Sequence, residues 1–187
     1  MEEKKTVCRA LCRGELPDGF SEILSEDLSL RVFDAVGREG MLVTAETDFG
    51  APNPMTATWG GFCVFLGEPC VLTFIRPSRY THTLIKKTRR LSLSFFGEDE
   101  KDALRVCGSM SGKNGDKIAA AGLSPFRLPE GPFSYFTARL AVAATVIFEM
   151  PLEQKGILDS DYLRYYRNGD LHTVFISRVD AVYCREG

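Results

Sequence analysis

The sequence predicts a mainly β protein, an antiparallel β-barrel with short helices at its periphery. Many short apolar stretches have strand character, and the longest of them covers residues 137–148. The helical stretches between them are short and follow no repeated βαβ rhythm, which argues against a parallel sheet. A chain of 187 residues with 44% hydrophobic residues is typical of one domain. We expect a loosely structured, charged leader over residues 1–20 and a single domain over residues 21–187.

The composition excludes several classes of partner. The chain carries 23 basic and 25 acidic residues, so its net charge of −2 favours neither nucleic acid nor an anionic membrane. It has no apolar run long enough to span a bilayer and no signal-peptide core, and we expect a cytoplasmic protein. Six scattered cysteines without a C-x-x-C pair, and only two histidines, predict no metal site. Cys8 and Cys12 lie in the leader, where nothing nearby indicates a role.

The first half of the domain predicts one helix followed by strands. Ser25 and two acids after it are typical of a helix start, and the helix would cover residues 28–36 and stop at Gly37 or Gly40. A strand over residues 41–45 and a turn over 48–52 lead into a strand over 53–59. Residues 63–66 and 71–75 predict a β-hairpin around a turn at 67–69.

The second half alternates short helices and strands. We expect helices at 81–89, 99–107, 116–121 and 159–167, and strands at 91–96, 137–148 and 171–183. A glycine-rich loop over residues 108–115 and a proline-rich connector at 125–132 separate these elements.

The strand over residues 53–59 is the first candidate binding element. Successive side chains of a strand point to opposite faces, so Thr56 and Thr58 share one face and Met55, Ala57 and Trp59 share the other. Small residues here leave room for a flat ligand against the backbone. The same pattern also fits a half-buried edge strand whose threonines face water.

Two loops have the composition of phosphate sites. The turn over residues 76–81 brings two arginines and two hydroxyl residues to a predicted helix N-terminus. The loop over residues 107–117 is rich in glycine and lysine, but it is not a P-loop: Gly108 and Gly112 are one residue too close, and Asn114 replaces the magnesium-binding hydroxyl. Each loop alone also fits a solvated surface turn.

His172 is the one candidate for proton chemistry, because it opens the last predicted strand and could shuttle a proton. A histidine at a strand end can equally be a structural hydrogen-bonding group. The sequence has no nucleophile elbow and no supporting Ser/His/Asp or Cys/His set, which ranks hydrolase chemistry low.

These segments in this order resemble the flavin reductase-like FMN-binding split-barrel proteins, and within them the flavoredoxin-like members. The resemblance covers residues from about Val32 to Val182 and leaves the leader outside. The motifs that carry it are residues 53–61, 74–81, 94–96, a helix ending in Cys107-Gly108, residues 111–117, and Ala121-Gly122-Leu123.

The resemblance implies a homodimer of split β-barrels with FMN at the subunit boundary. Residues 53–59 would line the flavin ring, and residues 76–81 with 111–117 would hold the phosphate. The Gly-Asp-x-His stretch ending at His172 would lie toward the nicotinamide side, with NAD(P)H as the possible donor. The implied cofactor-binding residues are Asn53, Met55, Thr56, Ala57, Thr58, Trp59, Arg76, Ser78, Arg79, Tyr80, Thr81, Ser111, Gly112, Lys113, Asp116 and Lys117.

The chain departs from the family pattern at two places, with Ser177-Arg178 where many relatives have Gly-Glu, and Ala144-Thr145-Val146 where a cysteine and basic residues are common. The leading hypothesis is an FMN-dependent NAD(P)H oxidoreductase, either a flavin reductase or a flavoredoxin-type electron carrier with a small-molecule or protein acceptor. One alternative is a non-catalytic flavin-binding or redox-sensing module. A second, a pyridoxamine-phosphate-oxidase-like enzyme, is disfavoured by the loop at 111–117. No dinucleotide fingerprint selects NADH or NADPH.

Overall fold

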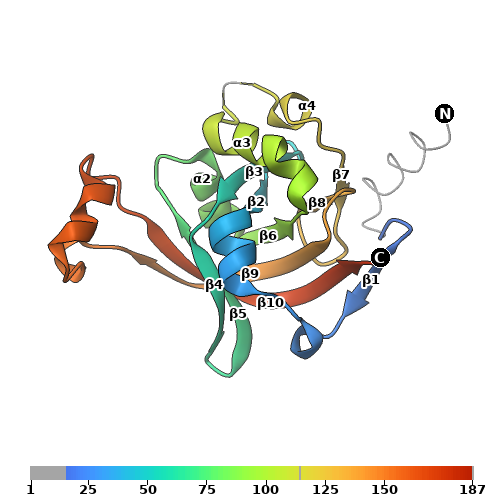
Figure 1. Cartoon of the computed structure of the whole chain (residues 1–187), viewed down its shortest axis with the longest axis horizontal. Coiled ribbons are helices and arrows are strands. Elements are labelled where there is room, and N and C mark those ends of the chain that lie inside the picture. Colours follow the sequence, from blue (N-terminus) through green and yellow to red (C-terminus); the bar gives the residue numbers. More distant parts are fainter. Residues whose placement is uncertain (1–15, 114, 187) are drawn as a thin grey trace.

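The main feature of the computed structural model, which describes residues 16–113 and 115–186, is a curled antiparallel sheet (Figure 1). Its strands follow the spatial order β3-β2-β6-β9-β10-β5-β4, and β1 adds to β10. A separate two-stranded sheet pairs β7 with β8. The strands are β1 Phe20–Ile23, β2 Met41–Glu46, β3 Pro52–Ala57, β4 Gly60–Phe65, β5 Glu68–Ile75, β6 Arg90–Phe95, β7 Pro125–Arg127, β8 Phe133–Tyr135, β9 Leu140–Pro151 and β10 Thr173–Arg185.

The order of the strands shows why the sheet forms a split barrel. β3 and β4 lie at opposite ends of the sheet, yet only Thr58 and Trp59 separate them in the chain. The sheet must therefore curl until its two edges converge. Among the described residues no ladder pairs β3 with β4, so the barrel stays open along this line. The predicted antiparallel split β-barrel is confirmed.

The corner between β3 and β4 depends on Gly60. A Cβ atom at this position would lie 2.5 Å from the backbone oxygen of Leu72 on β5. That distance is far below a normal contact, so only glycine lets the chain turn this corner against its neighbour. The next residue, Gly61, has open space at the same point.

Three buried clusters form among the described residues, and two of them position the site. The larger gathers apolar side chains of β2, β3, β5, β6, β9 and β10, together with residues of α2 (Tyr80–Thr88) and η2 (Phe33–Glu39). In the smaller, Leu42 packs with residues of α3 (Lys101–Ser109), including Leu104 and Cys107, next to α4 (Lys117–Ala120). α3 and α4 lie together at one end of the barrel (Figure 1). This packing fixes the ends of both helices next to β3.

The predicted helix over residues 28–36 is wrong in its position. Ser25–Asp27 forms an isolated 3₁₀ turn, η1, and the next residue, Leu28, is extended. Leu28, Leu30 and Val32 all pack against the main core, and this tertiary packing outweighs the helical spacing of the sequence. Of the three, Val32 already has helical dihedrals, directly before the helix. The helix begins only at Phe33, and Gly40 ends it with φ of 85°.

The β4–β5 hairpin has a tighter turn than predicted at residues 67–69. Leu66 and Gly67 alone form the loop, with φ values of 54° and 83°. Positive φ at both positions is typical of the two-residue turn that matches the twist of paired strands. Pro69 lies inside β5, beyond the last pair that β5 makes with β10, so its missing N–H removes no bond on that side.

Between β9 and β10 the chain forms an arm that projects from the barrel (Figure 1). The arm contains η4, Gln154–Gly156, and η5, Ser160–Tyr166, where the predicted helix at 159–167 appears as a 3₁₀ helix.

The predicted leader lies mostly outside the described residues, as do Cys8 and Cys12, while β1 already begins at Phe20. In the described part of the chain, no helix is long and apolar enough to cross a membrane.

Candidate functional site

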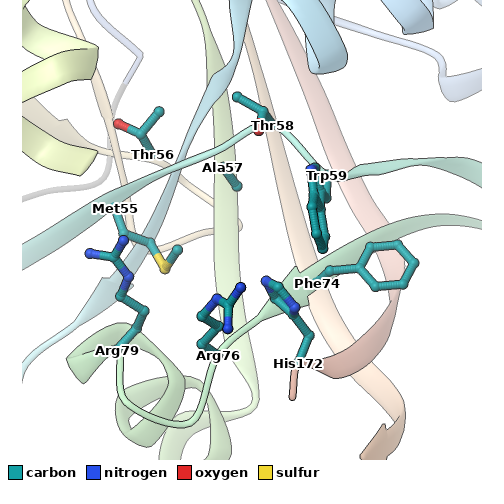
Figure 2. A pocket seen from close by; sticks show the side chains of 9 residues that line it. All are labelled: Met55, Thr56, Ala57, Thr58, Trp59, Phe74, Arg76, Arg79 and His172. Carbon is teal, nitrogen blue, oxygen red and sulfur yellow. The ribbon is translucent and has the colours of Figure 1, made fainter. Parts of the chain in front are cut away.

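Two adjoining cavities of about 240 Å³ each lie beside β3. They share Met55, Arg76 and Arg79, so together they form one continuous site with two compartments. The first cavity is also lined by Thr56, Ala57, Thr58, Trp59, Phe74 and His172 (Figure 2). The second is also lined by Ser78, Tyr80, Thr81, Ser109, Met110, Ser111, Gly112 and Lys117.

In the first cavity, the alternation of β3 places the predicted faces as expected. Met55, Ala57 and Trp59 point toward the cavity, while Thr56 and Thr58 point to the other side of the strand (Figure 2). The Thr56 hydroxyl donates a hydrogen bond to the backbone oxygen of Leu104 on α3. The wall facing the cavity is therefore apolar side chains and strand backbone, which suits a flat ligand.

His172 and Trp59 form the other end of the first cavity. Their ring centroids lie 4.7 Å apart with planes 38° apart. The Tyr166 hydroxyl and His172 Nδ1 are 2.9 Å apart, within a hydrogen bond. Burial, with a smaller contribution from Arg76, lowers the pKa of His172 to about 4. His172 is therefore neutral at neutral pH. It lies directly before β10, which begins at Thr173, and not on the strand as predicted.

Arg76 connects the turn over residues 76–81 to the arm by hydrogen bonds. Its guanidinium donates to the backbone oxygen of Asp170 at 2.6 Å and to that of Tyr165 at 3.0 Å. The Ser78 hydroxyl donates to the Asp170 carboxylate at 2.6 Å. Two of the predicted loop residues are thus committed to the arm, which keeps the turn over 76–81 in a fixed shape.

The second cavity is cationic. Arg79 donates to the Gly108 backbone oxygen at 2.9 Å, and Lys117 donates to the backbone oxygens of Pro54 and Cys107 at 2.8 and 3.3 Å. Burial lowers the pKa of Lys117, which is only 5% exposed, and Arg79 lowers it further. No ion pair within the described residues involves Arg79 or Lys117. Buried positive charge without a carboxylate partner favours an anionic ligand.

Three predicted site residues lie beside the second cavity without lining it. The Asn53 amide donates to the Thr81 hydroxyl at 2.7 Å, which braces β3 against the start of α2. The Asp116 carboxylate accepts from the backbone N–H groups of Ile118 and Ala119 and so caps α4. Lys113 is exposed, with its ammonium 5.4 Å from the centre of the Tyr80 ring.

Gly112 lets the loop over residues 107–117 pass close to Asn53. A Cβ atom at Gly112 would lie 1.9 Å from the Asn53 side-chain oxygen. The loop can approach β3 this closely only without a side chain at this position. The loop at 111–117 thus lies against the strand at 53–59.

Several residues of the site were not predicted. Phe74 could have been found, because it shares a strand face with Arg76 two positions later. Ser109 and Met110 only continue the end of α3 and carry no distinguishing signal. Tyr166 and Asp170 contact the site through the folded arm, and no sequence spacing indicates such a long-range contact.

Comparison with known proteins identifies the family. The family model described as flavin reductase like domain matches residues 33–187, most of the chain. The chain belongs to this family. A search of curated protein sequences found no significant match.

Solved structures of flavin reductase-like proteins share the fold. An FMN-binding domain of a flavin reductases-like enzyme from Shewanella baltica has a TM-score of 0.65 at 13% identity, over 91% of this chain and 80% of that one. An FMN-binding protein from Thermus thermophilus has a TM-score of 0.64 at 25% identity, over 89% and 82%. The flavoredoxin of Desulfovibrio vulgaris (Miyazaki F) has a TM-score of 0.64 at 21% identity, over 88% and 78%.

Proposed function

We propose that this flavin reductase-like protein binds FMN in the paired cavities and works as an oxidoreductase with NAD(P)H as its electron donor. The observation that carries the proposal is the joining of two cavities through Met55, Arg76 and Arg79, the first walled on one side by β3 and the second cationic. A planar ring with a phosphate at the end of a short chain fits such a pair of compartments.

The first cavity is the proposed ring site. Met55, Ala57 and Trp59 would contact the ring, and the backbone of β3 would supply hydrogen-bonding groups along its edge. His172 adds a neutral ring at the far end. These contacts orient a flat ligand, and Arg76 and Arg79 add positive charge where the two cavities join.

The second cavity is the proposed phosphate site. The buried Lys117 and the half-buried Arg79 supply positive charge, and the N-terminus of α2 adds backbone N–H groups at Tyr80 and Thr81. Ser111 adds a hydroxyl, while the Ser78 hydroxyl donates to Asp170 instead. Because Arg79 uses one N–H on Gly108, its remaining N–H groups are directed by that bond and can meet an anion.

When bound, FMN would supply the chemistry, accepting a hydride from the nicotinamide and passing electrons to a small-molecule or protein acceptor. The chain's own contribution is electrostatic and geometric. Arg76 and Arg79 lie where the cavities join, and their positive potential stabilises negative charge in the first cavity. A neutral His172 can pack against or hydrogen-bond a planar donor without exchanging a proton at neutral pH.

We also propose that the working form is a homodimer in which the site lies near the subunit boundary. Ile147, Phe148 and Met150 are exposed near the end of β9, and a dimer interface would bury this apolar surface.

Absorbance of the purified protein tests the function directly. We expect a bound yellow chromophore that is released as FMN on denaturation and is bleached by NADH or NADPH without oxygen. A colourless protein that takes up no added FMN would refute the binding site. Binding of FMN without bleaching by either nucleotide would refute the reductase and favour an electron carrier or a non-catalytic module.

A further inference from the structure

The β4–β5 hairpin carries two thiols that face each other across the strands. Cys63 on β4 is the direct partner of Cys70 on β5 in the strand register. Directly opposite residues of an antiparallel pair project from the same face of the sheet. Both cysteines are free thiols in the structure.

The register sets a separation that suits a disulfide. Phe65 and Glu68 flank the two-residue turn and therefore form a hydrogen-bonded pair, and the pairs alternate along the hairpin. Cys63 and Cys70 thus also occupy a hydrogen-bonded pair, where the Cα atoms lie about 5.5 Å apart. That Cα separation lies within the disulfide range of about 4.4–6.8 Å. The Cβ atoms of a hydrogen-bonded pair lie about 5.5 Å apart, wider than the about 3.5–4.5 Å of a disulfide, so the strands must shift slightly together to close the bond. The resulting bond is strained and therefore readily reduced.

A surface recess gives small molecules access to this pair. The recess has a volume of about 510 Å³, and both cysteines line it together with apolar residues that include Leu28 and Val64. Cys63 is half-buried, whereas Cys70 is only 1% exposed. Burial raises the pKa of both thiols, and the neighbouring Cys63 adds to the rise at Cys70. The more accessible thiol is therefore Cys63, with a shielded partner directly opposite.

We propose that Cys63 and Cys70 are a modification site that forms a reversible cross-strand disulfide on exposure to peroxide. The Cys63 thiolate attacks one oxygen of hydrogen peroxide, the O–O bond breaks, and hydroxide leaves as Cys63 becomes a sulfenic acid. The Cys70 sulfur then attacks the Cys63 sulfur and displaces the oxygen as water. Overall, two thiols lose two hydrogens and two electrons, and one peroxide becomes two waters. A dithiol reductant reverses the change by thiol–disulfide exchange.

The position of the pair links this modification to the cavity wall. Trp59 immediately precedes β4, and Phe74 and Arg76 lie at the other end of β5, so one hairpin supplies residues on two sides of the first cavity. A bond between Cys63 and Cys70 would hold the two strands in register. We expect it to raise the melting temperature by a few degrees, at most about 8 °C, because strain at this pair offsets part of the gain from closing the loop.

The experiment uses the reduced full-length protein treated with hydrogen peroxide, followed by alkylation and peptide mapping by mass spectrometry. We expect one linked peptide joining Cys63 to Cys70, lost after treatment with dithiothreitol. Cys63→Ser and Cys70→Ser should each abolish the linkage and the rise in melting temperature. Cys184→Ser, a half-buried cysteine outside the hairpin, should leave both unchanged.

Three outcomes would overturn the proposal. They are the absence of a Cys63–Cys70 linkage, a predominant linkage of either residue to another cysteine, and oxidation of Cys63 to sulfinic acid without a disulfide. None of these readouts depends on FMN or on turnover, so the result is separate from that of the proposed function.

Discussion

At the residue scale, the second cavity is defined by charge that the protein itself does not neutralise. Lys117 is buried, and among the described residues its ammonium donates hydrogen bonds only to backbone oxygens, while Arg79 lies nearby with one N–H committed to Gly108. Carbonyl dipoles offset part of the cost of burying the ammonium group, and an anion would offset more. This is the physical reason to expect a phosphate rather than a neutral group in that compartment.

The first prediction concerns Arg79. Replacing it in Arg79→Ala removes a charge-assisted contact worth on the order of 1.5–3 kcal/mol, so the Kd for FMN should rise at least roughly tenfold. Riboflavin, which lacks the phosphate, should bind almost as before. Quenching of flavin fluorescence measures both ligands.

Two control variants sharpen this measurement. Lys113→Ala should cause a smaller loss of FMN affinity, because Lys113 is exposed and its contribution is screened by solvent. Arg105→Ala, which removes an exposed arginine paired with Asp102 on α3, should change neither ligand. Equal losses for FMN and riboflavin in Arg79→Ala would contradict a phosphate role.

The second prediction concerns His172, for which the sequence fits either a functional or a structural role. The structure places it both in the cavity wall and in a hydrogen bond with Tyr166. We expect His172→Ala to slow anaerobic reduction by NAD(P)H roughly tenfold while FMN affinity stays within about twofold, because the phosphate contacts lie elsewhere. Stopped-flow absorbance measures the rate.

Tyr166→Phe is the matched variant for His172. It removes the hydrogen bond and keeps the aromatic ring, so melting temperature should fall while the reduction rate changes less than in His172→Ala. If His172→Ala lowers only the melting temperature and leaves the reduction rate unchanged, the histidine is a structural residue.

The third prediction uses the pKa of His172. Its value in the folded protein is about 4 against an ordinary value of 6.5, so the unfolded chain binds more protons between these limits. The stability from the neutral ring is therefore complete above pH 6.5 and is lost as pH falls toward 4. After solvent screening this contribution should be on the order of 1–2 kcal/mol.

Chemical denaturation at several pH values measures this effect. His82 is also buried with a lowered pKa, and it contributes in the same direction. The comparison of wild type with His172→Ala isolates His172, and the variant should lose less stability between pH 6.5 and 4.5. Parallel curves for the two proteins would show that His172 does not titrate as proposed.

At the element scale, the β3–β4 corner positions Trp59 between two strands that occupy opposite edges of the sheet. The alternation in residues 53–59 was enough to predict which side chains share a face, because that periodicity is local. It could not predict that the same strand bends back across the barrel at Gly60. That bend depends on a close approach to Leu72, which is twelve residues away.

The fourth prediction tests this corner. In Gly60→Ala the new Cβ would overlap the Leu72 backbone oxygen, so we expect destabilisation of about 1–3 kcal/mol and weaker FMN binding through displacement of Trp59. Gly61→Ala is the matched control, since a Cβ at Gly61 meets nothing within 4 Å and should leave stability the same or slightly higher. Urea denaturation separates the two. Equal stability of the two variants would show that the corner tolerates a side chain.

At the scale of the whole molecule, the sequence supported the fold better than the details of the site. Most strands are apolar runs bounded by turns, and this local pattern predicted an antiparallel barrel. The prediction of a helix that begins at Leu28 was wrong. The apolar spacing there fits a helix, but Leu28 is extended and packs against the main core. The arm contacts the site through Tyr166, which bonds to His172, and through Asp170, which bonds to Arg76. These contacts could not be predicted, because they form only once β9 and β10 are paired.

The final prediction concerns assembly. Phe148 is 44% exposed and its ring lies 5.7 Å from that of Phe65, while Leu66 at the tip of the β4–β5 hairpin is 80% exposed. These residues, with Ile147 and Met150, leave much apolar surface in water for a chain of this size, and a symmetric dimer would bury it. Light scattering of the FMN-loaded protein should give about twice the chain mass of 20.8 kDa.

Phe148→Glu should shift the protein toward a monomer, because a carboxylate in an apolar interface costs more than one in water. Phe49→Glu is the control, since Phe49 is also aromatic and even more exposed, at 97%, but lies at the β2–β3 turn rather than on β9 or the β4–β5 hairpin. If the site depends on the dimer, FMN affinity should fall with dissociation and should depend on protein concentration in Phe148→Glu alone. A monomer that retains FMN at nanomolar protein concentration would show that one chain is sufficient for binding.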